Sequence, residues 1–177
     1  MSDTKQLPER YLHISIADHR LHLIDNHQIV FKATIATAKN GVGEQFGSEC
    51  TPRGWHQIRA KIGKQCIENT VFIARRPTGE IYSQSLQQKH PGRDWILTRI
   101  LWLSGLEPGF NRSGKQDTMR RYIYIHGCPD DNPMGVDSSH GCIKMRNSDV
   151  ISLFDRVNTG ISVLISEKSF NEQQSNA

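Results

Sequence analysis

The chain has 177 residues, of which 36% are hydrophobic, and its formal net charge is +4. This length suits one domain with a sizeable core and is too short for two comfortable ones. No long Lys/Arg run with interleaved aromatic residues is present, so we expect no nucleic-acid partner. Four cysteines are too few for a disulfide scaffold in a chain of this size. No apolar run approaches the length of a membrane span, so we expect no membrane partner.

The first ten residues, MSDTKQLPER, form a polar lead-in. They contain no apolar segment of the kind that a secretory signal peptide needs. We therefore expect the chain to stay in the cytoplasm with its thiols reduced. Residues 11–166 are expected to form a single folded domain, and residues 167–177 a polar tail.

Short alternating segments separated by turns predict a mainly β fold, either a sandwich or a barrel. The predicted strands of the first half cover residues 11–17, 21–23, 29–35, 55–62 and 70–74. Residues 75–93 follow as a polar connection that contains prolines and glycines. Long loops of this kind often border functional clefts.

The second half of the chain carries one ambiguous segment and one clear helix. Residues 94–106 have apolar runs that fit a buried strand or a helix, and the all-β surroundings favour a strand. Helical spacing between Val150 and Val157 predicts a helix with its N-cap at residues 147–149 and Gly160 after its end. Residues 161–165 predict a last strand.

Residues 122–146, YIYIHGCPDDNPMGVDSSHGCIKMR, combine the side chains that thiol catalysis uses. A strand predicted from Met119 onward brings His126 to a polar loop that ends at Cys142. A nucleophilic cysteine needs a histidine to activate it. A glycine beside that cysteine, here Gly141, lets backbone N–H groups approach a carbonyl oxygen, as an oxyanion hole requires.

The period of two in a strand sorts these side chains onto faces. One face of the first predicted strand carries His126, Tyr124, Tyr122 and Arg120. One face of the second carries Cys142, Lys144 and Arg146. Each strand thus offers one residue of a catalytic type with cationic or phenolic neighbours, which indicates a cleft for an anionic substrate.

Two alternatives to catalysis remain open for these residues. His126 and Cys142 could be structural, because a free cysteine is often a small buried hydrophobe. The pairs His126/Cys128 and His140/Cys142 could instead supply four zinc ligands. The His-x-Cys spacing is tighter than the usual C-x₂₋₄-C or H-x₃₋₅-H, so we expect no metal and no other cofactor.

The ordered motifs resemble the signature of the L,D-transpeptidase (YkuD-type) catalytic domain. The resemblance rests on His126-Gly127, an eleven-residue gap, then SHGCIKM at residues 139–145, with TPRGW at residues 51–55 upstream. It spans residues 11–166 and implies a β-sandwich or barrel with one or two short helices. Two positions depart from the pattern. Cys128 replaces a small hydroxyl residue, and Lys144 replaces an Asn or Arg.

The resemblance also implies roles for individual residues. Cys142 is the expected nucleophile and His126 its base, with the backbone at Gly127 orienting the histidine. The segment containing Ser139, His140 and Gly141 is expected to shape the oxyanion site. The substrate-binding candidates are Lys144, Arg146, Arg120 and Tyr124.

The implied substrate bond follows an L-configured centre and precedes a D-amino acid, as in the diaminopimelate–D-Ala bond of murein tetrapeptides. Because we expect a cytoplasmic chain, its partner should be a soluble muropeptide from wall turnover, and water suffices as acceptor. We therefore favour a cysteine-dependent L,D-carboxypeptidase of peptidoglycan recycling, acting through a thioester on Cys142. The alternatives are a cross-linking L,D-transpeptidase and a non-catalytic zinc- or ligand-binding module.

Overall fold

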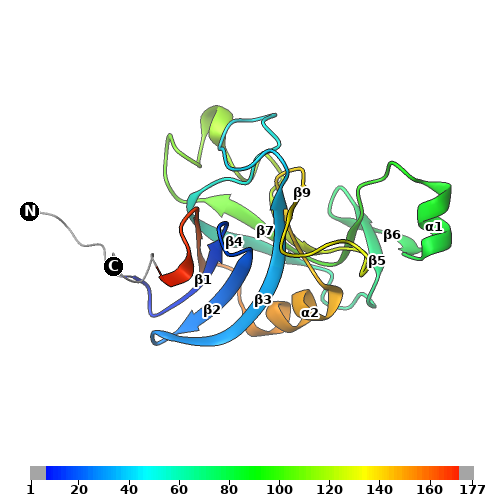
Figure 1. Ribbon diagram of the computed structural model, residues 1–177, viewed down its shortest axis with the longest axis horizontal. Coiled ribbons are helices and arrows are strands. Elements are labelled where there is room, and N and C mark those ends of the chain that lie inside the picture. Colours follow the sequence, from blue (N-terminus) through cyan, green and yellow to red (C-terminus); the bar gives the residue numbers. More distant parts are fainter. Residues whose placement is uncertain (1–6, 172–177) are drawn as a thin grey trace, which may run out of the picture.

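A computed structural model describes residues 7–171, which form a mainly β domain (Figure 1). The first strands are β1 (Arg10–Ser15), β2 (Arg20–Asp25), β3 (Gln28–Ala38), β4 (Gly54–Ile62), β5 (Thr70–Ile73) and β6 (Arg76–Ile81). The later strands are β7 (Ile96–Gly105), β8 (Tyr124–Gly127), β9 (Asp137–Ser139), β10 (Ile143–Met145) and β11 (Ser162–Ser166). Two helices, α1 (Gln84–Lys89) and α2 (Asn147–Arg156), and a 3-10 turn, η1 (Gly114–Gln116), lie between the strands.

The strands close into a barrel. They pair in the order β4-β11-β1-β2-β3-β10-β8-β7, and β7 pairs again with β4 to complete the circuit. The β5–β6 hairpin extends the sheet outward from β7, and β9 adds to β3. The expectation of a mainly β barrel or sandwich with short helices is thus confirmed.

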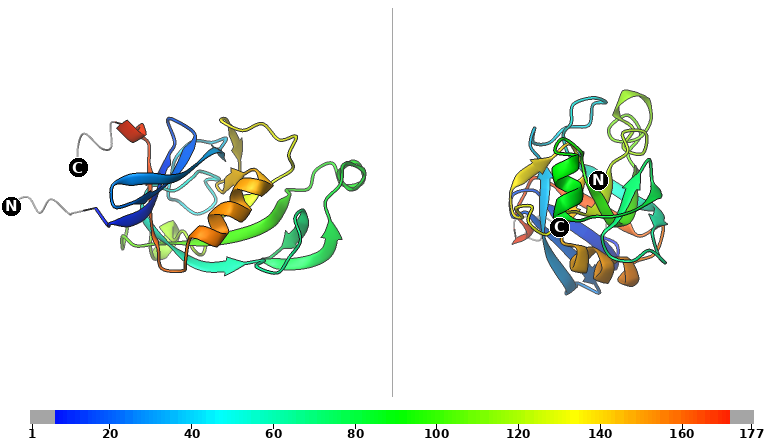
Figure 2. Two further views of the ribbon diagram at one scale, coloured as in Figure 1. Left: turned by 90° about the horizontal axis from the view of Figure 1, so that it is seen from below. Right: turned by 90° about the vertical axis from the view of Figure 1, so that its right-hand side faces the viewer.

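Alternation along the strands fills the interior. Leu12 pairs with Leu23 and Ile14 with Leu21, and all four side chains are buried in the main core. The amphipathic helix α2 covers one end of this core, and Figure 2 shows it lying against the sheet. Its core residues follow the helical spacing predicted from the sequence: Val150, Leu153 and Phe154, with Val157 just beyond the last turn. No helix within residues 7–171 is long and apolar enough to cross a membrane.

The strands next to the motif residues His126 and Cys142 are β8 and β10, which run parallel. Ile125 lies opposite Ile143, and His126 opposite Lys144. The isoleucines enter the core, so the alternate residues of both strands face away from it. This arrangement places His126, Lys144 and Tyr124 on one side of a continuous sheet.

Several predicted boundaries were wrong. The strand predicted from Met119 begins only at Tyr124, because residues 118–122 form turns. The Asp117 carboxylate accepts the backbone N–H of Arg120 and stabilises that turn, and Tyr122 has a positive φ of 57°. Arg120 therefore shares no strand face with His126.

The connection at residues 75–93 contains regular structure that the sequence analysis missed. Residues 76–81 form β6, which closes a hairpin with β5. Ser83 then caps α1 by accepting the backbone N–H of Leu86. The ambiguous segment at residues 94–106 holds β7, so the preference for a strand is confirmed. Residues 1–6, and residues 172–177 of the predicted tail, lie outside the described residues.

Candidate active site

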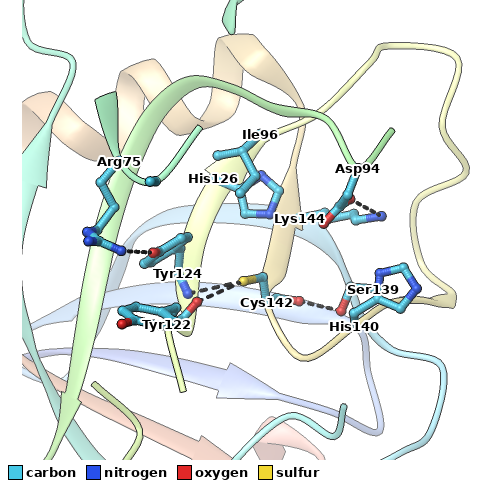
Figure 3. A pocket seen from close by; sticks show the side chains of 11 residues that line it. Arg75, Asp94, Ile96, Tyr122, Tyr124, His126, Ser139, His140, Cys142 and Lys144 are labelled. Carbon is cyan, nitrogen blue, oxygen red and sulfur yellow. Dashed lines mark hydrogen bonds and ion pairs between the residues drawn. The ribbon is translucent and has the colours of Figure 1, made fainter. Parts of the chain in front are cut away.

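A cleft of about 450 Å³ lies beside the β8–β10 pair (Figure 3). It is bounded by these strands, the turn at residues 139–142, the β5–β6 turn and the approach to β7. The lining residues are Ala74, Arg75, Asp94, Ile96, Tyr122, Tyr124, His126, Ser139, His140, Cys142 and Lys144. The motif residues expected to carry chemistry therefore meet at one cavity.

Cys142 stands at the cleft just before β10. Its Sγ accepts the backbone N–H of Tyr124 at 3.3 Å and donates toward the backbone carbonyl of Tyr122 at 3.5 Å. These two contacts fix the sulfur against the start of β8. The Tyr124 N–H favours a thiolate at this position, because it donates to the sulfur.

His126 is fully buried and has one defined tautomer. Its Nδ1 lies 2.8 Å from the backbone carbonyl of Gly127. A carbonyl only accepts, so Nδ1 carries the proton. Nε2 then carries the lone pair, and it has no hydrogen-bond partner within residues 7–171. An unpaired basic nitrogen at the cleft is what a general base for the Cys142 thiol requires.

Burial keeps this pair neutral at rest. Withdrawal from water raises the pKa of the Cys142 thiol to about 12, against partial relief from the Tyr124 N–H. The same loss of hydration lowers the pKa of His126, which the Asp94 carboxylate opposes. The site therefore holds a thiol beside a neutral imidazole.

The turn that carries the nucleophile is held from both sides. Ser139 Oγ donates to the Cys142 carbonyl at 2.5 Å and accepts the Gly141 N–H at 3.2 Å. Thr51 Oγ1 donates to the Gly141 carbonyl at 3.1 Å and accepts the Ala38 N–H at 3.0 Å. The Gly141 N–H is thus engaged with Ser139, which leaves the Cys142 N–H as the candidate donor to the oxyanion.

Gly141 is required for this turn. Its φ is +122°, a conformation that side chains rarely adopt, and a Cβ would lie 3.2 Å from the Cys50 carbonyl oxygen. The motif TPRGW contributes to this turn through Thr51, whose hydroxyl donates to the Gly141 carbonyl. The sequence motif alone indicates no role for Thr51, because its partner Gly141 lies 90 positions further along the chain.

Asn147 stabilises the end of β8, the strand that carries His126. The sequence placed it at a helix N-cap, but Arg146 occupies that position. The buried Asn147 amide donates to the Cys128 carbonyl at 3.0 Å, and its oxygen accepts from Thr98 at 2.5 Å. It packs so closely that a Cβ on Gly127 would lie 2.4 Å from its Oδ1. Gly127 therefore lets the end of β8 approach α2.

The charged residues of the cleft differ from those expected. Lys144 lines it, but is only 8% exposed, donates to the Ser138 carbonyl and lies 4.0 Å from Asp94. Arg120 and Arg146 do not line the cleft. Arg146 instead donates to the Asp130 carbonyl. Arg75, which the sequence analysis left inside a polar connection, lines the cleft and donates to the Tyr124 hydroxyl at 3.0 Å.

The four residues of the zinc alternative form no metal site within residues 7–171. Cys128 is fully buried and its Sγ donates toward the Met145 carbonyl at 3.4 Å. Burial raises the pKa of this thiol to about 11, which disfavours the thiolate that a metal would need. His140 is exposed at the cleft edge. Within residues 7–171, no three His, Cys, Asp or Glu side chains are grouped as metal ligands.

The closed β barrel presents a cysteine, a tautomer-fixed histidine and a glycine-shaped turn at one cleft. These are the features that a cysteine-dependent acyl-transfer domain requires. The L,D-transpeptidase catalytic domain family (YkuD) matches residues 9–165. The chain belongs to this family.

Solved structures agree on the fold. A cysteine-to-serine mutant of Enterococcus faecium L,D-transpeptidase is 14% identical, with a TM-score of 0.55 over 90% of this chain and 50% of that one. L,D-transpeptidase 3 from Mycobacterium tuberculosis is 16% identical, with a TM-score of 0.53 over 90% and 62%. Bd1075 from Bdellovibrio bacteriovorus is 15% identical, with a TM-score of 0.55 over 99% and 55%. The chain thus spans only 50–62% of the length of these three solved relatives. No curated protein matches it.

Proposed function

We propose that the protein is an L,D-carboxypeptidase that releases D-Ala from murein tetrapeptides by cleaving the diaminopimelate–D-Ala bond. The observation that carries this proposal is that Cys142 and His126, whose Nε2 has no hydrogen-bond partner within residues 7–171, line the same cleft. The cleft volume of about 450 Å³ fits one peptide end. We also propose that the substrate is a soluble muropeptide met in the cytoplasm.

The reaction balances with water as the second substrate. His126 Nε2 takes the thiol proton as Cys142 Sγ attacks the diaminopimelate carbonyl, and the carbonyl oxygen becomes an oxyanion. Collapse of this intermediate breaks the C–N bond, and the imidazolium returns the proton to the leaving D-Ala amine. Water then attacks the thioester with His126 again as base. The products are a tripeptide carboxylate and a free thiol.

Resolution of the thioester by an amine is the second candidate. The solved relatives include proteins named L,D-transpeptidases, and the same thioester would serve a cross-linking reaction. A cross-linking enzyme must admit an acceptor peptide beside the donor, whereas hydrolysis needs only water as acceptor. We favour the carboxypeptidase because the soluble muropeptide that we propose as substrate can be processed with water alone.

The test follows the fate of the thioester. The purified protein is incubated with a tetrapeptide in heavy-oxygen water, with and without an excess of a second peptide as amine acceptor, and the products are weighed by mass spectrometry. We expect a tripeptide carrying one heavy oxygen in both cases. Cross-linked dimer as the main product would favour the transpeptidase.

Matched variants complete the test. Cys142→Ala should abolish turnover, and His126→Ala should do comparable damage because the two residues act as a unit. Cys66→Ala, which removes a half-buried thiol outside the cleft, should retain turnover. No cleavage of any L,D-bond by the unmodified protein would refute the proposed function.

A further inference from the structure

Arg75 reaches the cleft from a strained turn. It follows Ala74 in the link between β5 and β6, and the two residues have φ values of 65° and 47°. Two consecutive positive φ values are typical of a tight hairpin turn, where Asn and Gly are the preferred residues. Alanine and arginine pay a steric penalty there. An arginine kept in this conformation at a cleft suggests a role for its side chain.

The guanidinium is held between aromatic rings. Its Cζ lies 4.6 Å from the centroid of Trp102 and 4.8 Å from that of Tyr122. Its Nη1 donates to the Tyr124 hydroxyl at 3.0 Å. Ring faces attract a cation and exclude water from it. The side chain is thus fixed in place before any ligand arrives.

Arg75 also lacks an anionic partner. No carboxylate within residues 7–171 forms an ion pair with it. A guanidinium carries five N–H donors in a planar fork, and the Tyr124 hydroxyl accepts from one nitrogen. A carboxylate can therefore bind the remaining donors, in the two-point geometry that makes such pairs strong. Lys144, the other cation of the cleft, already lies beside Asp94 and donates to a backbone carbonyl.

Tyr124 contacts both the Arg75 guanidinium and the Cys142 thiol. Its backbone N–H donates to Cys142 Sγ, and its hydroxyl accepts from Arg75 (Figure 3). The two groups are therefore separated by about one tyrosine side chain. In a tetrapeptide the terminal carboxylate belongs to the residue directly after the scissile carbonyl, a single step of ~3.8 Å along the chain.

We propose that Arg75 binds the terminal α-carboxylate of the leaving D-amino acid, with Trp102, Tyr122 and Tyr124 holding the guanidinium in place. The proposal rests on the proposed function for the identity of the peptide. With Arg75 in this role, the cleft selects peptides that end in a free α-carboxylate directly after the scissile bond. A pentapeptide or a C-terminal amide presents a neutral amide group at this point, and the arginine then stays unpaired against the rings.

The test separates binding from turnover. Calorimetry measures the affinity of the full chain carrying Cys142→Ala for L-Ala-γ-D-Glu-diaminopimelate-D-Ala and for the same peptide ending in D-alaninamide. We expect the acid to bind on the order of 10- to 100-fold more tightly than the amide, as for a hydrogen-bonded charge pair. Adding Arg75→Gln should make the two affinities equal within about threefold.

Two further variants control the interpretation. Arg76→Gln removes an exposed arginine from the same hairpin, and it should keep the preference for the acid. Tyr124→Phe keeps the backbone N–H to Cys142 and removes only the hydroxyl that holds Arg75, so it should weaken the preference severalfold. Thermal unfolding of each variant shows whether it is folded.

The outcomes distinguish the two proposals. If the acid preference survives Arg75→Gln, or if neither peptide binds, the carboxylate site is overturned. If the preference depends on Arg75 but the unmodified protein releases no D-Ala from either peptide, the carboxylate site stands and the proposed function fails.

Discussion

The hydroxyl of Thr51 gives the sharpest test of how the nucleophile turn is held. It is fully buried and makes two hydrogen bonds, one to the Gly141 carbonyl and one from the Ala38 N–H. Thr51→Val keeps the shape and removes both bonds. Each of the two backbone groups then stays buried without this partner, at a cost of about 1–3 kcal/mol. We expect the free energy of unfolding to fall by about 2–6 kcal/mol.

The controls separate the hydroxyl from the packing. Thr51→Ser keeps both bonds and loses one buried methyl, so it should cost only about 1 kcal/mol. Thr159→Val makes the same exchange at an exposed site and should stay within about 0.5 kcal/mol of the unmodified protein. Urea unfolding measures stability, and D-Ala release measures activity. If Thr51→Val proves as stable and active as Thr51→Ser, the hydroxyl bridge does not hold the turn.

Other predictions follow from the same packing and burial. Gly127→Ala would place a Cβ 2.8 Å from the Leu97 carbonyl oxygen and should destabilise the protein by about 1–3 kcal/mol in urea unfolding; an unchanged midpoint would contradict this. Limited alkylation followed by peptide mapping should label Cys142 before Cys128, because Cys128 is fully buried; the reverse order would count against Cys142 as nucleophile. Burial lowers the pKa of His56 to about 4, below its value of ~6.5 in the unfolded chain. The free energy of unfolding should therefore fall by up to about 3 kcal/mol as pH drops from 6.5 to 4. In His56→Gln this pH-dependent part of the fall should be absent when urea unfolding is compared at both pH values.

Local alternation was sufficient to predict which sides of β8 and β10 face the core. The alternation of Ile125 and Ile143 with polar neighbours indicated which side of each strand enters the core, and the structure places both isoleucines there. Because side chains alternate with a period of two, His126 and Lys144 had to face the other way. The resemblance of the ordered motifs to the L,D-transpeptidase family then implied that Cys142 and His126 act together, and both residues line one cleft.

The residues that sequence reasoning missed depend on contacts between distant segments. Arg75 enters the cleft because β5 and β6 form a hairpin beside β7. No local pattern in residues 75–93 predicted this hairpin. Thr51 meets Gly141 across 90 positions of the chain. Asn147 is a residue type that often caps helices, but its buried amide instead hydrogen-bonds to the Cys128 carbonyl and the Thr98 hydroxyl. Positive φ at Ala74 and Arg75 was equally invisible, since neither residue type signals such a turn.

The charge state of the resting pair decides how the thiol is activated. Burial favours the neutral forms of both Cys142 and His126. In the proposed reaction we therefore expect the proton to move from sulfur to Nε2 only as the bond to substrate forms. Thiolate absorbs in the ultraviolet, and the spectrum of a Cys142→Ser variant subtracts every other thiol. The difference spectrum should show no thiolate at pH 7 and should rise only on strong alkalinisation. The Asp94 carboxylate raises the pKa of both groups, so Asp94→Asn should move the rise to lower pH. A full thiolate signal at pH 7 would show that a preformed ion pair does the chemistry.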